Sequence, residues 1–198
     1  MEPIIYLNEN NSRLVGMKNY FSTDLFEILN ALPFNIQPEI RLFGKICRQK
    51  RDVLFISDVS EGYKYSGQMA EAKKFGDVAC GEYLKQLLEA VNKSLNTKFN
   101  GILINRYVDG NNLISAHSDS ETGLDPNNST VASISFGATR TFRIKNKVTK
   151  ELVCDVEHEN GMLLLMQGEF QKHYTHEIPR QKTQKGCRIS LTFRTHED

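Results

Sequence analysis

The sequence predicts an α/β chain that is mostly β, in which an α/β N-terminal portion packs on a β-rich C-terminal half. Two observations support this prediction. The best helical pattern lies at residues 81–96, and the chain after it consists of short runs that are β-branched or alternate in polarity. Turn residues separate these runs, and their close spacing favours a sandwich or barrel, with a jelly roll as one candidate.

The expected helices lie in the N-terminal portion. Asp24 and Glu27 resemble the capped start of a helix that apolar residues continue until Pro33. The helix at residues 81–96 has an apolar face formed by Leu84, Leu87, Leu88, Val91 and Leu95.

Between the two helices lies the clearest basic segment of the chain. Residues 41–51 contain five cations and no acid. Residues 57–68, which are rich in Gly and Ser, are expected to form a loop with a short strand. Beyond the second helix, strands are expected at residues 101–107, 131–136, 141–144, 152–156, 162–166 and 188–194.

Composition narrows the class of protein. A length of 198 residues suits a single domain, and 39% hydrophobic with 25% charged residues is ordinary for a soluble globular chain. The formal net charge of +1 argues against nucleic-acid binding over the whole surface, so any such contact needs a local patch. No apolar run is long enough to cross a membrane, so no membrane partner is expected. Widely spaced cysteines and the lack of a secretory pattern suggest an intracellular protein, with nucleus and cytoplasm not resolved.

A His-x-Asp pair is the first candidate for chemistry. His117 and Asp119 lie two residues apart, and with a later histidine they would form a two-His-one-carboxylate triad that leaves one face of an iron ion open. Both His173 and His176 are available as the third ligand, and spacing does not choose between them. His158 is interpreted as part of a surface turn.

The strand expected at residues 188–194 carries two cations on one face. Because strand side chains alternate, Arg188, Ser190, Thr192 and Arg194 share a face. A solvated face is one explanation. A pocket for an anion is the other, because guanidinium groups bind carboxylates in forked pairs, and a small dicarboxylate on iron would need a cation at each end.

The segments "FNGILINRYVDG", "HSDSE", "ASISFGATRTF", "THEIP" and "RISLTFR" occur in this order and resemble the AlkB family of Fe(II)- and 2-oxoglutarate-dependent dioxygenases. The resemblance covers roughly residues 41–194 and is close to the animal homologues that repair duplex DNA. It implies a double-stranded β-helix, or jelly roll, with supporting N-terminal helices. Residues 1–198 would form one domain, with an N-terminal extension and nucleotide-recognition region at 1–80 and a catalytic core at 99–194.

The same resemblance implies a set of cofactor residues. Fe(II) would be bound by His117, Asp119 and His176. His176 is chosen because the third ligand of this family is followed by one residue and then by "IP" or "LP". Arg188, helped by Tyr107, would bind the distal carboxylate of 2-oxoglutarate, while Arg194 and Asn105 would lie at the iron-chelating end. The full set implied for the cosubstrate is Asn105, Tyr107, Arg188, Ser190, Thr192 and Arg194.

Substrate residues are implied in the same way. "RLFGK", with Phe43 and Gly44, resembles the finger that fills the gap left by an extruded base. Tyr65 would stack on that base, opposite the ring of His117. The remaining implied contacts are Tyr63 and Ser66 in the base pocket, Glu121 near the exocyclic nitrogen, and Arg51 at phosphate or the opposite strand.

The resemblance implies oxidative demethylation of N-alkylated bases, of the 1-methyladenine and 3-methylcytosine type, in DNA. The reaction would use Fe(II), O2 and 2-oxoglutarate and would release formaldehyde. The protein is expected to be a monomer that acts on nucleic acid. Three alternatives stay open: the same chemistry on RNA or protein, a non-catalytic module that binds damaged bases, and a zinc site of hydrolase type.

Overall fold

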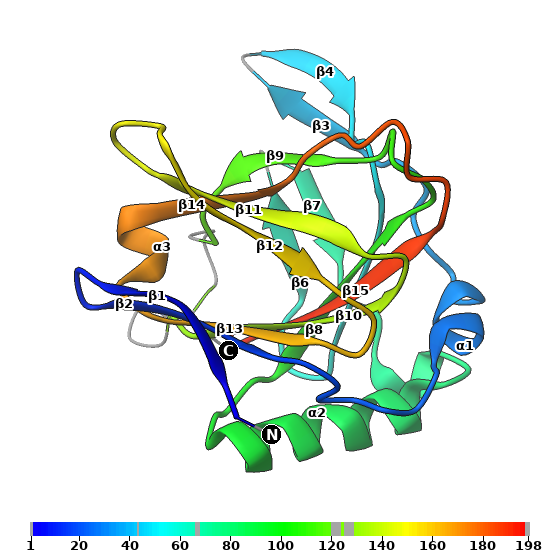
Figure 1. The fold of residues 1–198 in the computed structure, drawn as a ribbon. Helices are drawn as coiled ribbons and strands as arrows, with labels where there is room; N and C mark the ends of the chain where they lie inside the picture. The colour runs from blue at the N-terminus through cyan, green and yellow to red at the C-terminus, as the bar shows by residue number, and fades with distance from the viewer. Residues whose placement is uncertain (1, 43, 66–67, 120–123, 125–128, 197–198) are drawn as a thin grey trace.

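The computed structural model describes residues 2–42, 44–65, 68–119, 124 and 129–196. Within these residues, seven strands form the larger of the two main antiparallel sheets and four strands form the smaller. The two sheets face each other as in a jelly roll (Figure 1), which confirms the predicted mostly β fold class. No helix among the described residues is long and apolar enough to cross a membrane.

Strands from both halves of the chain form the larger sheet. Three of them precede residue 58, although the predicted jelly-roll core begins at residue 99. In spatial order the strands are β1 (Ile4–Glu9), β2 (Ser12–Met17), β13 (Leu163–Gly168), β10 (Val131–Gly137), β15 (Arg188–Arg194), β8 (Gly101–Tyr107) and β5 (Asp52–Ser57).

The smaller sheet contains two short strands, β9 and β14, that were not among the runs listed as expected strands. In β14 three polar residues follow one another, so it lacks the alternation that marks a half-buried strand. The order of this sheet is β12 (Leu152–His158), β11 (Arg140–Asn146), β14 (Tyr174–Ile178) and β9 (Ile114–His117).

Helices cover the outer face of the larger sheet. The predicted second helix is confirmed as α2 (Gly81–Leu95), which ends where Asn96 adopts a left-handed conformation. The first, α1 (Phe26–Asn30), is shorter than predicted, and Asp24 accepts a hydrogen bond from the backbone N–H of Phe26. A one-turn helix α3 (Phe170–His173) and a 3-10 turn (Phe75–Asp77) complete the helical elements described.

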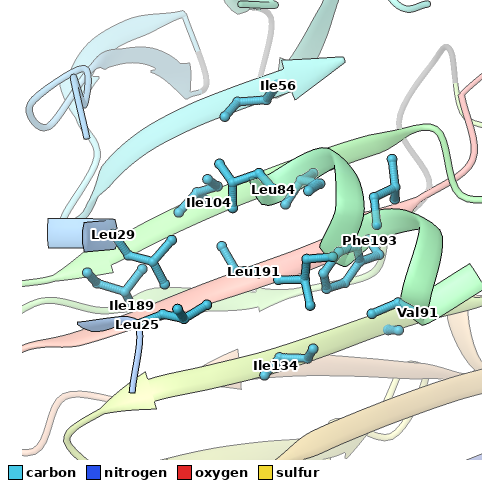
Figure 2. Packing of buried hydrophobic residues seen from close by; sticks show 14 of the residues in the cluster. Leu25, Leu29, Ile56, Leu84, Val91, Ile104, Ile134, Ile189, Leu191 and Phe193 are labelled. Carbon is cyan, nitrogen blue, oxygen red and sulfur yellow. The ribbon is translucent and has the colours of Figure 1, made fainter. Parts of the chain in front are cut away.

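Strand β15, in the interior of the larger sheet, is buried on both faces because a layer lies on each side of it. Ile189, Leu191 and Phe193 point towards α1 and α2 and pack there with Leu84 and Leu29 (Figure 2). The alternate residues, Arg188 to Arg194, therefore face the smaller sheet. The pairing of β15 with β8 then sets Arg188 opposite Tyr107 and Ser190 opposite Asn105.

Leu191→Ala is expected to lower the free energy of unfolding by about 2–5 kcal/mol, because the side chain is fully buried and its loss leaves a cavity under α2. Urea denaturation followed by circular dichroism measures this change. Leu152→Ala, at an exposed position of β12, is the control and should change stability by less than about 0.5 kcal/mol. Equal losses in the two variants would contradict the packing described.

The basic segment forms a hairpin that stands apart from the two sheets (Figure 1). It consists of β3 (Glu39–Leu42) and β4 (Lys45–Arg48), and all four residues of β4 are exposed. Gly44 lies between the strands with a φ of +78°, a conformation that favours glycine. A second hairpin joins β6 (Gly62–Tyr65) and β7 (Gln68–Glu71).

Candidate metal and cosubstrate site

Three side chains that could bind one metal ion meet at two neighbouring strands of the smaller sheet. His117 ends β9 and pairs with His176 of β14, and Asp119 follows β9. Nε2 of His117 lies 3.6 Å from Oδ1 of Asp119, and Nε2 of His176 lies 3.8 Å from Oδ2. One ligand atom from each residue lies within 4.8 Å of the others, so the three can share a single ion.

Both histidines are neutral, which is the form that binds metals. Burial, together with the positive charge that His176 would carry, lowers the pKa of His117 to about 3. Burial also lowers the pKa of His176 to about 3. Nδ1 of His117 lies 2.9 Å from the carbonyl oxygen of Ser115. A proton held there on Nδ1 leaves the lone pair of Nε2 facing Asp119.

Asp119 supplies the negative charge of this cluster and is 4% exposed. Its Oδ1 accepts a hydrogen bond from Nη2 of Arg194 at 2.6 Å, and its backbone N–H donates to Gln171. Its Oδ2 is buried and has no hydrogen-bond partner among the described residues. A buried carboxylate oxygen in this state is costly unless a cation binds it, so the cluster fits a divalent metal such as Fe(II).

The geometry also separates the two histidines that spacing alone left open. His176 lies in the cluster, and its ring stacks on Phe142 with centroids 5.1 Å apart. His173 ends α3, and its Nε2 lies 3.1 Å from a carboxylate oxygen of Glu169 outside the cluster. The structure therefore brings His176, and not His173, to His117 and Asp119.

The larger sheet provides the opposite wall of a pocket that reaches both metal-facing histidines. Two arginines of β15 line it, Arg194 near Asp119 and Arg188 at the other end of the strand. Every side chain that was assigned to 2-oxoglutarate lines this pocket: Asn105, Tyr107, Arg188, Ser190, Thr192 and Arg194. The described lining includes no carboxylate, so the pocket suits an anion.

Arg188 is a buried cation with neutral partners. It is 1% exposed, its Nε donates to Oγ of Ser135 at 2.8 Å, and its guanidinium lies over the ring of Tyr107. Burial lowers its pKa to about 10. Arg140, whose guanidinium also lies near this ring, uses all of its nitrogens to donate to Gln181 and to backbone carbonyls. Arg140 is thus a structural residue, whereas Arg188 retains capacity for a ligand.

The structure revises the role assigned to Arg51. The side chain is 2% exposed and lines the pocket, where its Nε donates to Oδ1 of Asn105 at 2.8 Å. A contact with phosphate or the opposite strand does not fit this burial. The reason is local: the basic run leaves the exposed strand β4 and enters β5, so its last cation turns inward.

The sequence analysis missed the two side chains that hold Arg188 from behind the pocket. His158 is fully buried in β12, where its Nδ1 lies 3.0 Å from Nη2 of Arg188, so the interpretation as a surface turn is wrong. Its alternation with Val156, which is also buried, was the signal available. Ser135 faces Arg188 from β10, and the polar alternation of "VASISF" could have indicated it.

Most of the side chains assigned to the substrate lie outside the described residues. Phe43, Ser66 and Glu121 fall outside, and for Tyr63 and Tyr65 the structure describes only the backbone of β6. A groove between the basic hairpin and β9 is described. It is lined by Ile40, Cys47, Arg48, Gln49, Lys50, Arg51, Leu113, Ile114, Ser115, Ala116 and His117.

Lowering the pH from 7 to 5 is expected to destabilise the metal-free protein by about 2 kcal/mol for each of His117 and His176. In the unfolded chain each imidazole takes up a proton as the pH falls through about 6.5, whereas in the folded protein both stay neutral down to about pH 3. Protons therefore favour the unfolded chain, and stability present above pH 6.5 is lost as the pH falls.

Urea denaturation at pH 7, 6 and 5 measures this effect. His176→Gln should remove about 2 kcal/mol of the dependence, because the glutamine does not titrate. An unfolding free energy that is equal at pH 7 and pH 5 in the wild type would show that the two imidazoles are not held neutral.

Comparison with known proteins places this site in context. Residues 18–194 match the family model described as the 2OG-Fe(II) oxygenase superfamily. The chain is 30% identical over 182 residues to the DNA oxidative demethylase ALKBH2 of Arabidopsis thaliana, which covers 80% of this chain and 57% of that protein. It is 32% identical over 162 residues to the Homo sapiens ALKBH2, covering 78% of this chain and 60% of that protein.

A third relative is the Mus musculus alpha-ketoglutarate-dependent dioxygenase alkB homolog 3, 33% identical over 117 residues that cover 55% of this chain and 41% of that protein. The chain spans less than two thirds of the length of these relatives. Among solved structures, OsALKBH1 is similar with a TM-score of 0.57 over 98% of this chain and all of that one, at 16% identity. That likeness concerns the fold alone.

Proposed function

Because the chain belongs to the 2OG-Fe(II) oxygenase superfamily, we propose that it is an AlkB-type dioxygenase that oxidatively demethylates N-alkylated bases in DNA and releases formaldehyde. The observation that carries the proposal is that a three-residue cluster able to bind a metal, two of whose members line the pocket, lies across that pocket from a pair of arginines of the larger sheet. Curated relatives at about 30% identity are named DNA oxidative demethylases. Bases methylated at nitrogen, as in 1-methyladenine and 3-methylcytosine, are the proposed substrates.

Each wall of the pocket has its own role in this proposal. His117, Asp119 and His176 would hold Fe(II), with Arg194 fixing the orientation of the Asp119 carboxylate. Fe(II) with 2-oxoglutarate and O2 supplies the oxidising chemistry that converts an N-methyl group to an N-hydroxymethyl group, with succinate and carbon dioxide as the other products. Arg188 would bind the distal carboxylate of 2-oxoglutarate by a charge-assisted contact.

Apolar side chains keep water away from the reacting centre. Phe142 stacks on His176, and Ile114 and Ile178, which pair with each other across β9 and β14, also line the pocket. Excluding water strengthens the contacts between the arginines and the dicarboxylate, because those contacts act in a low dielectric. The protein thus positions the reactants and protects them, while the cofactor supplies the oxidation.

The groove beside the basic hairpin supports a nucleic-acid substrate. It shares His117 and Arg51 with the pocket, and Arg48 and Lys50 add exposed cations to its lining. Cations along a path to the metal site suit a polyanion whose modified base must reach that site. This local patch accounts for DNA binding by a chain whose net charge is only +1.

The test is an incubation of the protein with Fe(II), 2-oxoglutarate and oligonucleotides that carry 1-methyladenine or 3-methylcytosine, single- and double-stranded, as DNA and as RNA. Mass spectrometry of the oligonucleotides measures the loss of methyl groups. Loss from DNA that requires both iron and 2-oxoglutarate is the expected result. Loss of methyl groups from RNA only would show that RNA, and not DNA, is the substrate. No loss of methyl groups from any oligonucleotide would overturn the proposal.

A further inference from the structure

His158 is a buried titratable residue that the proposed mechanism has not yet used. It is fully buried on β12 of the smaller sheet and reaches across to β15 of the larger one. Its Nδ1 lies 3.0 Å from Nη2 of Arg188, and its Nε2 lies 3.1 Å from the carbonyl oxygen of Met162. The imidazole therefore contacts the arginine that faces the pocket, but it does not line the pocket itself.

These two contacts define the state of the ring. A carbonyl oxygen can only accept, so Nε2 of His158 carries the proton and donates it to Met162. A guanidinium can only donate, so Nδ1 must accept from Arg188. Burial and the neighbouring positive charge of Arg188 keep the pKa of His158 well below its ordinary value. His158 is thus a neutral acceptor in one defined orientation.

The partners of Arg188 distinguish it from two other buried arginines. Arg194 is paired with Asp119, so a carboxylate offsets its positive charge. Arg140 has neutral partners, as Arg188 does, but each of its three guanidinium nitrogens donates to one of them. Arg188 forms no ion pair with a described residue. It donates from Nε to Ser135 and from Nη2 to His158, both neutral, and its Nη1 has no hydrogen-bond partner among the described residues.

This arrangement fixes the plane of the guanidinium without reducing its charge. Two neutral acceptors on Nε and Nη2 prevent rotation, and Nη1 is left for an incoming anion. A carboxylate at position 158 would also orient the group, but it would neutralise the charge that the anion needs. We propose, on the basis of the proposed function, that His158 is a positioning residue that holds Arg188 as a preorganised, uncompensated cation for the distal carboxylate of 2-oxoglutarate.

Four variants separate this role from a purely structural one. His158→Asn keeps a hydrogen-bond acceptor at the position of Nδ1, whereas His158→Phe keeps the ring and removes the acceptor. His158→Asp has the same shape as His158→Asn but adds a negative charge beside Arg188. Val156→Ala is the control, because Val156 is equally buried two residues earlier on β12 and makes no contact with Arg188 that the structure describes.

The main readout is the dissociation constant of 2-oxoglutarate for the Mn(II)-loaded protein without oxygen, measured by calorimetry. We expect binding to weaken at least tenfold in His158→Phe and His158→Asp, and to stay within threefold of wild type in His158→Asn and Val156→Ala. In the iron-loaded enzyme, His158→Phe should raise KM for 2-oxoglutarate while kcat at saturating 2-oxoglutarate changes less than threefold, because His158 does not contact the reacting atoms.

Each other outcome has a definite meaning. Wild-type affinity in both His158→Phe and His158→Asp would overturn the inference, and so would equal weakening in His158→Asn and His158→Phe. If His158→Phe does not fold, the comparison of His158→Asp with His158→Asn decides alone, because the two differ only in charge. A wild-type protein that neither binds 2-oxoglutarate nor demethylates DNA would instead defeat the proposed function, and this inference with it.

Discussion

Asp119→Asn is expected to reduce formaldehyde release from methylated DNA roughly 1,000-fold or more and to abolish tight binding of Mn(II) or Fe(II). Asp119 provides the only negative charge among the three residues of the cluster, and its Oδ2 is buried without a hydrogen-bond partner among the described residues. An amide of the same shape offers no charge to a dication. Two neutral imidazoles would then have to hold the metal beside the cation of Arg194.

The asparagine variant is preferable to alanine because of Arg194. Removing the whole side chain would leave a buried guanidinium without its carboxylate, which typically costs 3–5 kcal/mol of stability and would confuse loss of metal with loss of fold. The amide oxygen of asparagine can still accept the hydrogen bond from Nη2.

Ser118→Ala is the matched control for this prediction. Ser118 precedes Asp119, and its hydroxyl donates to the backbone of Tyr174 without contacting the cluster. Its activity should stay within threefold of wild type, as measured by formaldehyde release and by the electron paramagnetic resonance of bound Mn(II). Full activity or undiminished metal binding in Asp119→Asn would show that the cluster is not the metal site.

The parts of the fold that were predicted correctly are those in which local pattern and global packing agree. Strands β8 and β15 coincide with the predicted runs at 101–107 and 188–194, because both are rich in β-branched and apolar residues that bury one face under α1 and α2. The shared face of Arg188 and Arg194 followed from the same alternation. That this face points towards the smaller sheet and not towards solvent could not be predicted, because it depends on the position of the second sheet.

The missed features depend on contacts between distant segments. Strands β9 and β14 carry the two histidines of the metal cluster, but they are only four and five residues long, and β14 has no alternation of apolar and polar residues. Arg51 belongs by composition to an exposed basic run, yet it hydrogen-bonds to a residue that follows 54 positions later. The contact of His158 with Arg188 joins opposite sheets across 30 residues of sequence, which no local pattern reports.

Arg188→Met is expected to weaken the binding of 2-oxoglutarate roughly 100-fold, a loss of about 3 kcal/mol. Methionine is also unbranched and fills a similar volume above Tyr107, but it removes the positive charge of Arg188. That charge is available to a ligand because the described lining of the pocket contains no carboxylate. Charge-assisted contacts in a buried site are strong because no water replaces them. Arg188→Lys should bind 2-oxoglutarate with intermediate affinity, since an ammonium supplies the charge but not a fork that also reaches Ser135 and His158.

The control for this prediction is Arg106→Met on the neighbouring strand β8. Arg106 is also an arginine of the larger sheet, but it pairs with Asp52 and lies over Phe34, away from the pocket. Its loss should lower stability and leave the affinity for 2-oxoglutarate within threefold of wild type, as measured by calorimetry with the Mn(II)-loaded protein. If Arg188→Met also stays within threefold, the buried cation serves the packing of β15 against β12, and the dicarboxylate must bind elsewhere in the pocket.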